Sequence, residues 1–386
     1  MMETLISVER AQEILASHPF KWATEEIGLE HAQGRILTRD ILARCDDPPF
    51  DNSSIDGWAV QLSDLPESRI EIGTIFAGDQ PITKSLNPTE IYRIMTGAPI
   101  PLGADALVMV EDGIQGLPRQ DYIRRKGENI SLGEVALSTG DLVTSSSCAL
   151  AATIGHKSLP VRSKLRIAII PTGDELTELG KPLEPGRIYD SNSIALSALI
   201  RKAGAEPIFI KPVLDNQESL HKTLDYCAEE VDLILTSGGV SMGEKDFIRS
   251  SLIERNAAIF WKVLMRPGGP PIFGHWNGTP IFGLPGNPVS SQTVFHLLIV
   301  PWISHPDIFH RRVIVKMEEG LRGADNRLCL RRIQITSSET GLVGRPLTHQ
   351  GSGNVRSMVL NDALTLIPPN TNIEPGEHVD ALWLIA

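Results

Sequence analysis

Four segments of the sequence place glycine beside hydroxyl, carboxylate or guanidinium side chains, each directly after a run of aliphatic residues. They are PTGDEL at 171–176, TSGGVSMGEKD at 236–246, MRPGGPP at 265–271 and LPGNPVSS at 284–291. Residues of these types can bind an anion through peptide N–H groups and a divalent cation through carboxylates. The chemistry they could support depends on whether the fold brings the four segments together.

The segment TSGGVSMGEKD has the composition of an anion site. Gly238 and Gly239 let a ligand approach the peptide N–H groups closely, and Ser241 adds a hydroxyl beside an expected helix start. Glu244 and Asp246 would repel a bare phosphate, but they fit if a divalent cation bridges protein and phosphate oxygens. We therefore predict a phosphate site that uses Mg²⁺. The alternative is a glycine-rich turn whose aspartate caps the next helix.

Two other loops supply further charges. Asp174 and Glu175 follow Thr172 and Gly173 at a strand end, where they can serve either a metal site or a helix cap. Arg266 has a permanent positive charge and a planar donor fork suited to phosphate or another oxyanion. An isolated arginine is more often a surface ion-pair partner, so this residue has a simpler interpretation as well.

Three polar segments complete the set of candidate loops. In LPGNPVSS, Pro285, Gly286 and Asn287 form a rigid turn whose amides could face the same crevice as the glycine pair. In DNSSIDGWAV, small polar residues up to Asp56 crowd together before a strand, and LTHQGSGNVRSM places Ser352 between two glycines. Each of these is also compatible with an ordinary loop.

Residues 163–303 have the pattern that would bring the four glycine loops together. Strand-like runs such as KLRIAII, EPIFI and VDLILTS alternate with helical patterns such as SNSIALSALIRKAGA and NQESLHKTLDYCAEE. This alternation predicts a doubly wound, mostly parallel sheet covered by helices on both faces. In such a sheet the ligand crevice lies beyond the carboxyl ends of the strands, where these loops are expected.

The rest of the chain has different patterns and predicts three further domains. Residues 1–42 read as helical, in SVERAQEILASH and again in EEIGLEHAQGRILTRDIL, and are grouped with residues 128–162 as a split helical domain. Residues 43–127 contain short strands separated by Pro, Gly, Asn and Asp, which indicates an inserted β domain. Residues 304–386 return to short strands and form a C-terminal β domain.

Composition excludes several function classes. The 386 residues include 47 acidic and 36 basic side chains, and the formal charge of -11 argues against binding to nucleic acid or to an anionic membrane surface. No apolar run is long enough to span a bilayer. The N-terminus lacks the cationic start and apolar core of a secretory signal, so we expect a cytoplasmic protein.

The motifs occur in the order seen in a known family. DNSSIDGWAV, IMTGAPIP, PTGDEL, IYDSN, TSGGVSMGEKDF, RPGGPP, GLPGNPVS and HQGS resemble the molybdopterin molybdenumtransferases, MoeA and the gephyrin E domain. The resemblance covers the chain from about residue 5 to its C-terminus. It implies a homodimer whose subunit has a split helical domain, an inserted β domain, a molybdopterin-binding α/β domain and a C-terminal β barrel. It also implies insertion of molybdate into adenylylated molybdopterin, with Mg²⁺-dependent release of AMP.

The resemblance assigns roles to individual residues. Asp174, Glu175, Asp215 and Asp246 would position Mg²⁺ or the pyrophosphate, and Arg266 would provide a cation for an oxyanion. The remaining residues carried over by their motifs are Asp56 and Thr96 from the partner subunit, Arg332 and Ser352 near molybdate, and Gly238, Gly239, Ser241, Pro285, Gly286 and Asn287 along the crevice. Other proteins of molybdenum cofactor biosynthesis are further expected partners.

Two departures from the family pattern keep alternatives open. The family commonly has Lys-Pro-Gly-Lys-Pro, whereas RPGGP keeps a cation at Arg266 and has Gly269 at the second position. In GENI, Asn129 replaces a common aspartate. These changes favour, as the alternative to an active transferase, a divergent paralogue that binds a pterin or nucleotide, or acts as a scaffold, without turnover. A third alternative is transfer of tungstate.

Overall fold

The computed structural model describes residues 2–210, 212–213, 216–240, 246–305, 311–339, 341–346 and 349–384. The chain divides into two compact units. The first consists of Met1–Ala23 and Ser163–Ala386, and the second consists of Thr24–Arg162. The N-terminal segment thus belongs with the α/β part of the chain.

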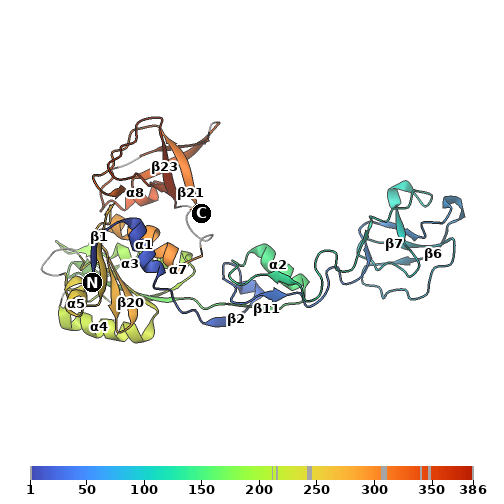
Figure 1. Cartoon of the computed structure of the whole chain (residues 1–386), viewed down its shortest axis with the longest axis horizontal. Helices are drawn as coiled ribbons and strands as arrows, with labels where there is room; N and C mark the ends of the chain where they lie inside the picture. The colour runs from blue at the N-terminus through green and yellow to red at the C-terminus, as the bar shows by residue number, and fades with distance from the viewer. Residues whose placement is uncertain are drawn as a thin grey trace. The chain divides into compact units, whose positions relative to one another are not determined.

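A seven-stranded sheet forms the centre of the first unit (Figure 1). Its strands lie in the order β1 (Glu3–Ile6), β17 (Ala258–Val263), β19 (Ile272–Trp276), β20 (Thr279–Leu284), β16 (Leu233–Ser237), β12 (Arg166–Pro171) and β15 (Glu206–Phe209). Only β19 runs antiparallel to its neighbours within this sheet of described residues. The predicted mostly parallel sheet is confirmed.

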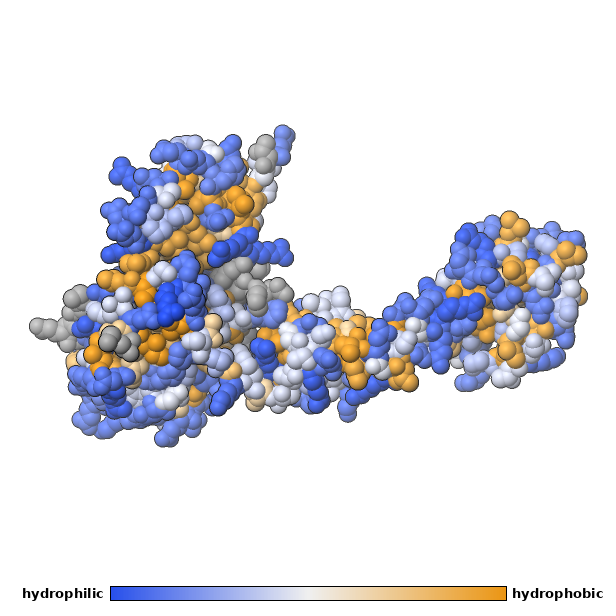
Figure 2. Space-filling model, in the orientation of Figure 1, coloured by the Kyte–Doolittle hydropathy of each residue, from blue (hydrophilic) through white to orange (hydrophobic). Residues whose placement is uncertain are grey.

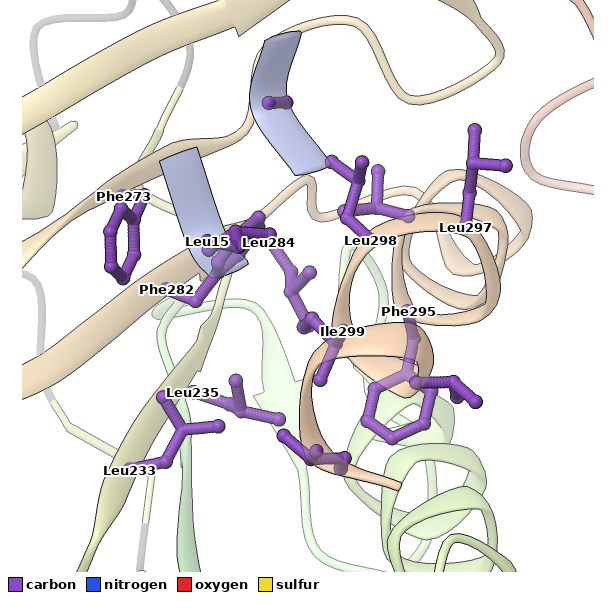
Figure 3. Close-up of a cluster of buried hydrophobic side chains, with 14 of the residues drawn as sticks. Leu15, Leu233, Leu235, Phe273, Phe282, Leu284, Phe295, Leu297, Leu298 and Ile299 are labelled. Atoms are coloured by element: carbon purple, nitrogen blue, oxygen red, sulfur yellow. The ribbon is translucent and has the colours of Figure 1, made fainter. Parts of the chain in front are cut away.

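Helices cover both faces of the sheet. Successive strand residues point to opposite faces, and both sets are apolar, so each face needs a layer of helices to bury it. Leu233 and Leu235 belong to one core cluster, part of which is drawn in Figure 3, and Ile234 belongs to the cluster on the other face. The helices on the first face are α1 (Val8–Ala16), α3 (Ser191–Lys202), α6 (Pro288–Val294) and α7 (Val300–Ile303), and those on the second are α4 (Gln217–Glu230) and α5 (Phe247–Glu254). A π-helical turn, Phe295–Ile299, joins α6 to α7.

The helix boundaries follow the capping residues in the sequence. The Asn216 side chain accepts a hydrogen bond from the Ser219 N–H (2.9 Å) and starts α4, as its position predicts. Leu220, Leu224 and Cys227 form the buried face of this helix. The outer surface over α4 is mostly hydrophilic in Figure 2, as expected for an amphipathic helix on a sheet.

The helical prediction for residues 24–42 is wrong apart from a 3-10 turn at Leu29–His31. Thr24–Gly28 forms strand β2, which pairs antiparallel with β11 (Ser158–Arg162). Ile27 packs against the core of this unit while Glu25 and Glu26 are exposed. The strand has no alternating burial pattern, and its pairing partner lies far away in the sequence, so no local window detects it.

The described part of the second unit has hydrophobic cores in two regions that use different strands, and in one of these regions buried clusters lie on both faces of a sheet. One is built from β2, β11, helix α2 (Ser145–Thr153) and the pair β3 (Ile41–Leu42) and β10 (Val135–Leu137). The other lies in a four-stranded sheet in the order β6 (Ile70–Ile75), β7 (Glu90–Ile94), β5 (Gly57–Val60) and β8 (Ala106–Met109), beside the pair β4 (Asn52–Ser53) and β9 (Ile123–Arg124). The predicted β segment is thus a sheet with its own core.

The C-terminal residues form a closed barrel, as the family resemblance implies. Its strands are β21 (Arg312–Met317), β24 (Gly341–Arg345), β23 (Arg332–Ser338), β25 (Ala363–Thr365) and β26 (His378–Trp383), with the short helix α8 (Arg356–Val359) before β25. The pair of β18 (Met265–Arg266) with β22 (Leu328–Cys329) links this part to the α/β part. The described helices are all too short or too polar to cross a bilayer.

Candidate functional site

A cavity of about 510 Å³ lies beyond the carboxyl ends of the parallel strands β12, β16 and β20. Loops from three of the four predicted segments contribute most of its wall, and Pro270 comes from the fourth. The lining residues singled out in the sequence are Glu175, Gly238, Gly239, Asp246, Pro285, Gly286 and Asn287. The strand ends therefore form one site, as the parallel arrangement requires.

The glycine pair after β16, Gly238 and Gly239, lines the cavity. Gly238 and Gly239 have φ values of +104° and +70°, which are left-handed conformations that favour glycine. The Gly238 N–H donates to Leu284 O (3.0 Å) within the sheet. A Cβ atom built on Gly286 would lie 3.8 Å from Gly238 Cα, so the loops after β16 and β20 touch each other.

Of the predicted metal-binding carboxylates, Glu175 and Asp246 line the cavity. Asp174 does not, and its main-chain carbonyl accepts a hydrogen bond from the exposed Arg187 guanidinium. Asp215 and Ser241 lie outside the described residues. No cluster of three or more His, Cys, Asp or Glu side chains with metal-binding geometry occurs in the described part of the chain.

The alternative roles of these carboxylates as helix caps do not hold. Asp246 is the N-cap residue of α5, yet its side chain makes no capping hydrogen bond. Glu175 is followed by a short strand, β13 (Leu176–Thr177), which pairs with β14 (Ile188–Tyr189), and not by a helix. Two carboxylates in a cavity suit Mg²⁺, which usually takes one or two protein carboxylates together with phosphate oxygens.

Arg332 and Ser352 lie in the barrel part, beside the start of α6. Arg332 is only 1% exposed, and its guanidinium donates to Ser357 Oγ (3.0 Å) and Gly351 O (3.1 Å). Ser352 O accepts a hydrogen bond from the Val289 N–H (3.0 Å). Burial, and the nearby Arg331, lower the pKa of Arg332 to about 10, so the side chain is still a cation at neutral pH.

The surroundings of Arg332 differ from those of a structural ion pair. Within the described part of the chain no carboxylate lies within ion-pair distance of this guanidinium, and its two acceptors, Ser357 Oγ and Gly351 O, are neutral. Arg266 is exposed on β18, where its carbonyl accepts from the Leu330 N–H (2.8 Å). A buried cation with neutral partners can accommodate an oxyanion, since paired carboxylates would otherwise repel it.

Asp56 and Thr96 come together in the second unit. Asp56 Oδ1 accepts hydrogen bonds from the Thr96 N–H (2.7 Å) and hydroxyl (2.9 Å), and these bonds lower the pKa of Asp56. The following Gly57 is required by packing, because a Cβ atom there would lie 1.8 Å from Val108 O. The motif IDGW thus combines a close strand contact with a carboxylate held in its ionised form.

Sequence reasoning assigned no site role to the segment 188–192, all of which lines the cavity and which includes Asp190 and Asn192. Asp190 caps α3, with Oδ1 accepting from the Ser193 N–H (3.0 Å). Asn192 Nδ2 donates to Ser237 Oγ (2.7 Å) and Gly286 O (2.8 Å), and so bridges the ends of β16 and β20. The motif IYDSN contained a signal for the cap, but not for this bridge, which depends on three separate segments.

Three family models match successive parts of the chain. The MoeA N-terminal region (domain I and II) matches residues 6–155, the probable molybdopterin binding domain matches residues 168–305, and the MoeA C-terminal region (domain IV) matches residues 315–384. The central match contains the strands and loops that form the cavity.

Similar proteins extend over almost the whole chain. A molybdopterin molybdenumtransferase of Haemophilus influenzae is 38% identical over 313 residues, covering 78% of this chain and 77% of the relative. A protein of the same name from Bacillus subtilis is 32% identical over 409 residues and covers 99% and 94%. The crystal structure of the molybdopterin biosynthesis MoeA protein from Pyrococcus horikosii matches with a TM-score of 0.83 and 29% identity, over 99% of this chain and 100% of that chain.

Proposed function

The chain belongs to the molybdopterin molybdenumtransferase (MoeA) family, and on that premise we propose that it inserts molybdate into adenylylated molybdopterin and releases AMP. The observation that carries the proposal is the cavity at the strand ends. It combines the left-handed glycine pair with the carboxylates of Glu175 and Asp246. A pyrophosphate group needs both a close approach to backbone amides and compensation of its charge.

The glycines and the carboxylates of the cavity have different proposed roles. Gly239 and Gly286 allow the pyrophosphate to approach the backbone where the two loops touch. Glu175 and Asp246 would hold Mg²⁺ together with pyrophosphate oxygens, and the ion when bound would neutralise negative charge that develops as AMP leaves. Asp190 Oδ1 accepts the capping hydrogen bond of α3, so this oxygen is less available as a ligand of Mg²⁺.

Molybdate is the second substrate, and Arg332 is the residue proposed to receive it. Its cation is buried with only neutral hydrogen-bond partners among the described residues, next to the loop that contains Ser352. Charge-assisted hydrogen bonds from a guanidinium suit a tetrahedral oxyanion. Tungstate has the same charge and the same arrangement of oxygens, so the two oxyanions must be compared directly.

The test is AMP release by the purified protein from adenylylated molybdopterin, with Mg²⁺ and molybdate omitted in turn. Release that requires both supports the transferase. Binding of the substrate without release under any of these conditions would contradict it and favour the non-catalytic pterin-binding or scaffold alternative. That alternative is supported by Gly269, which lacks the second lysine of the family motif.

The proposal includes a cytoplasmic homodimer in which the partner subunit contributes Asp56 and Thr96. Mixing two inactive variants, Asp56→Asn and Asp246→Asn, tests this arrangement. Random mixing makes half the dimers mixed, and each mixed dimer has one intact composite site, so roughly a quarter of the activity should return. If one chain supplied all of these residues, no mixture would regain activity.

A further inference from the structure

Asn192 holds the ends of two neighbouring strands through a single amide nitrogen. It is the second residue of α3, after the cap Asp190 and Ser191. Its Nδ2 atom lies 2.7 Å from Ser237 Oγ and 2.8 Å from Gly286 O. Ser237 is the last residue of β16, and Gly286 follows the end of β20.

The chemistry of Gly286 fixes the direction of both bonds. A peptide carbonyl can only accept, so the atom of Asn192 that faces it must be the amide nitrogen. That nitrogen has two hydrogens, one for each neighbour, and the Ser237 oxygen must therefore accept the second one. The Asn192 Oδ1 atom is left buried without a hydrogen-bond partner in the described structure, which an amide oriented for stability alone would avoid.

The Ser237 hydroxyl hydrogen is consequently available as a donor. The Ser237 side chain lines the cavity, the residue is only 5% exposed, and Asn192 is the one described residue that hydrogen-bonds its Oγ atom. A hydroxyl whose oxygen already accepts a bond can donate its hydrogen to an anion. Such a donor is strong when the acceptor is a charged phosphate oxygen.

We infer that Asn192 is a positioning residue that turns the Ser237 hydroxyl into a dedicated donor to a phosphate oxygen of the bound substrate. The inference rests on the proposed function, because it requires a phosphate-bearing ligand in this cavity. Asn192 itself touches the protein and acts through Ser237. The same contacts hold the two glycine loops against each other, where a Cβ atom on Gly286 would lie 3.8 Å from Gly238 Cα.

The first experiment is a double-mutant cycle on the full chain, with binding of AMP and of inorganic pyrophosphate measured by calorimetry. Ser237→Ala and Asn192→Leu should each weaken AMP binding by roughly tenfold to a hundredfold, the value of one hydrogen bond to a charged group. The double variant should bind no worse than the weaker single variant, because both changes remove the same contact. Binding of adenosine, which lacks the phosphate, should be the same in all four proteins.

A second variant reverses the polarity of the bridge. Asn192→Asp keeps the shape of the side chain but offers an acceptor to Ser237, so the hydroxyl hydrogen turns away from the ligand. In the Asn192→Asp background, adding Ser237→Ala should therefore cost no further AMP affinity. Thr279→Val is the matched control, because it removes the hydrogen bond from Thr279 Oγ1 to Ala228 O (2.8 Å) at the opposite end of β20.

The outcomes separate this inference from the proposed function. Multiplicative losses in the Ser237→Ala and Asn192→Leu pair, or an equal loss of adenosine binding, would overturn the inference while the unaltered protein still releases AMP. Phosphate-specific, non-additive losses without any turnover would support the inference and contradict the transferase. Failure of the unaltered protein to bind either AMP or pyrophosphate would overturn both. Thermal unfolding of every variant, compared with Thr279→Val, shows whether it is folded.

Discussion

Replacing Arg332 by methionine should greatly weaken the response to molybdate while changing stability only modestly. The guanidinium is 1% exposed and donates to Ser357 Oγ and Gly351 O, with no carboxylate partner among the residues described. Removing one member of a buried ion pair usually costs 3–5 kcal/mol because it leaves an uncompensated charge. No such charge remains after Arg332→Met, so the expected cost is smaller.

The size of the effect on stability follows from two opposing contributions. Burial and Arg331 lower the pKa of Arg332 to about 10, which corresponds to a penalty of about 3 kcal/mol on the buried charge. The substitution relieves this penalty but removes two hydrogen bonds from a charged donor, about 1.5–3 kcal/mol each. Ser357 Oγ still donates to Asn354 O (2.6 Å), whereas Gly351 O loses its donor. The free energy of unfolding should therefore fall by roughly 0–3 kcal/mol.

The effect on activity is read from AMP release at increasing molybdate concentration. Loss of one charge-assisted bond to the oxyanion raises the concentration needed for half-maximal rate by roughly tenfold to a hundredfold. Arg332→Lys keeps the charge without the planar fork, so the molybdate concentration that it needs for half-maximal rate should lie between those of the unaltered protein and Arg332→Met. Arg69→Met is a matched control, because Arg69 is also buried and donates to the carbonyls of Ile114 and Gly116 in the second unit.

Two results would refute the reasoning about Arg332. A molybdate response in Arg332→Met that equals that of Arg69→Met would mean that Arg332 does not receive the oxyanion. A loss of more than about 5 kcal/mol in the free energy of unfolding would mean that the guanidinium is an essential structural contact. Urea unfolding and the rate measurement on the same preparation decide between these outcomes.

Three further predictions concern other parts of the first unit. Asp246→Asn should reduce Mg²⁺-dependent AMP release by at least roughly a hundredfold, because it removes a proposed ligand of the ion, and equal turnover would exclude Asp246 from the reaction. Thermal unfolding should change little, since asparagine has nearly the same shape and suits the N-cap position of α5 equally well. Gly269→Lys should increase the rate over a Gly269→Ala control if a second cation is missing, and equal rates would show that Gly269 is no deficit. In both variants the new Cβ would lie 3.2 Å from Met265 O, a tight contact, so the alanine control carries the same packing cost as the lysine. Burial, and then His18, lower the pKa of His275 below 6.5, so the unfolded chain binds the proton more readily than the folded chain. The melting temperature should therefore fall as the pH drops from 6.5 through the folded-state pKa. If the melting temperature of His275→Gln depended on pH as steeply as that of the unaltered protein, this reasoning would be wrong.

The fold was predictable where local signals were strong. The alternation of strands and helices in residues 163–303 gave the doubly wound sheet, and Asn216 correctly marked the start of α4. Strand β2 was missed because it is short, begins with three exposed polar residues and pairs with β11, which follows most of the second unit in the sequence. The sequence around Thr24–Gly28 cannot reveal a partner that arrives about 130 residues later.

The site was predictable as a set of loops, but not as a geometry. Asp174 and Glu175 are adjacent, and only the conformation of their loop decides that Glu175 faces the cavity. Asn192 has no distinctive local pattern, since its role arises from contacts with Ser237 and Gly286 in two other segments. Burial of Arg332 was equally invisible, because LCLRRI contains two arginines and the sequence does not say which one points inward.

The two departures from the family pattern do not have equal weight as signs of lost activity. Asn129 Nδ2 donates to Asp47 Oδ2 (2.9 Å), so an aspartate at this position would bring two carboxylates together. The asparagine is therefore matched to its own neighbour within the second unit, and its missing charge is no evidence against catalysis. At Gly269 the charge is lost within its own segment, since RPGGPP has Arg266 as its one cationic residue. The non-catalytic alternative thus depends on one position, and the rate of Gly269→Lys relative to Gly269→Ala measures what that position contributes.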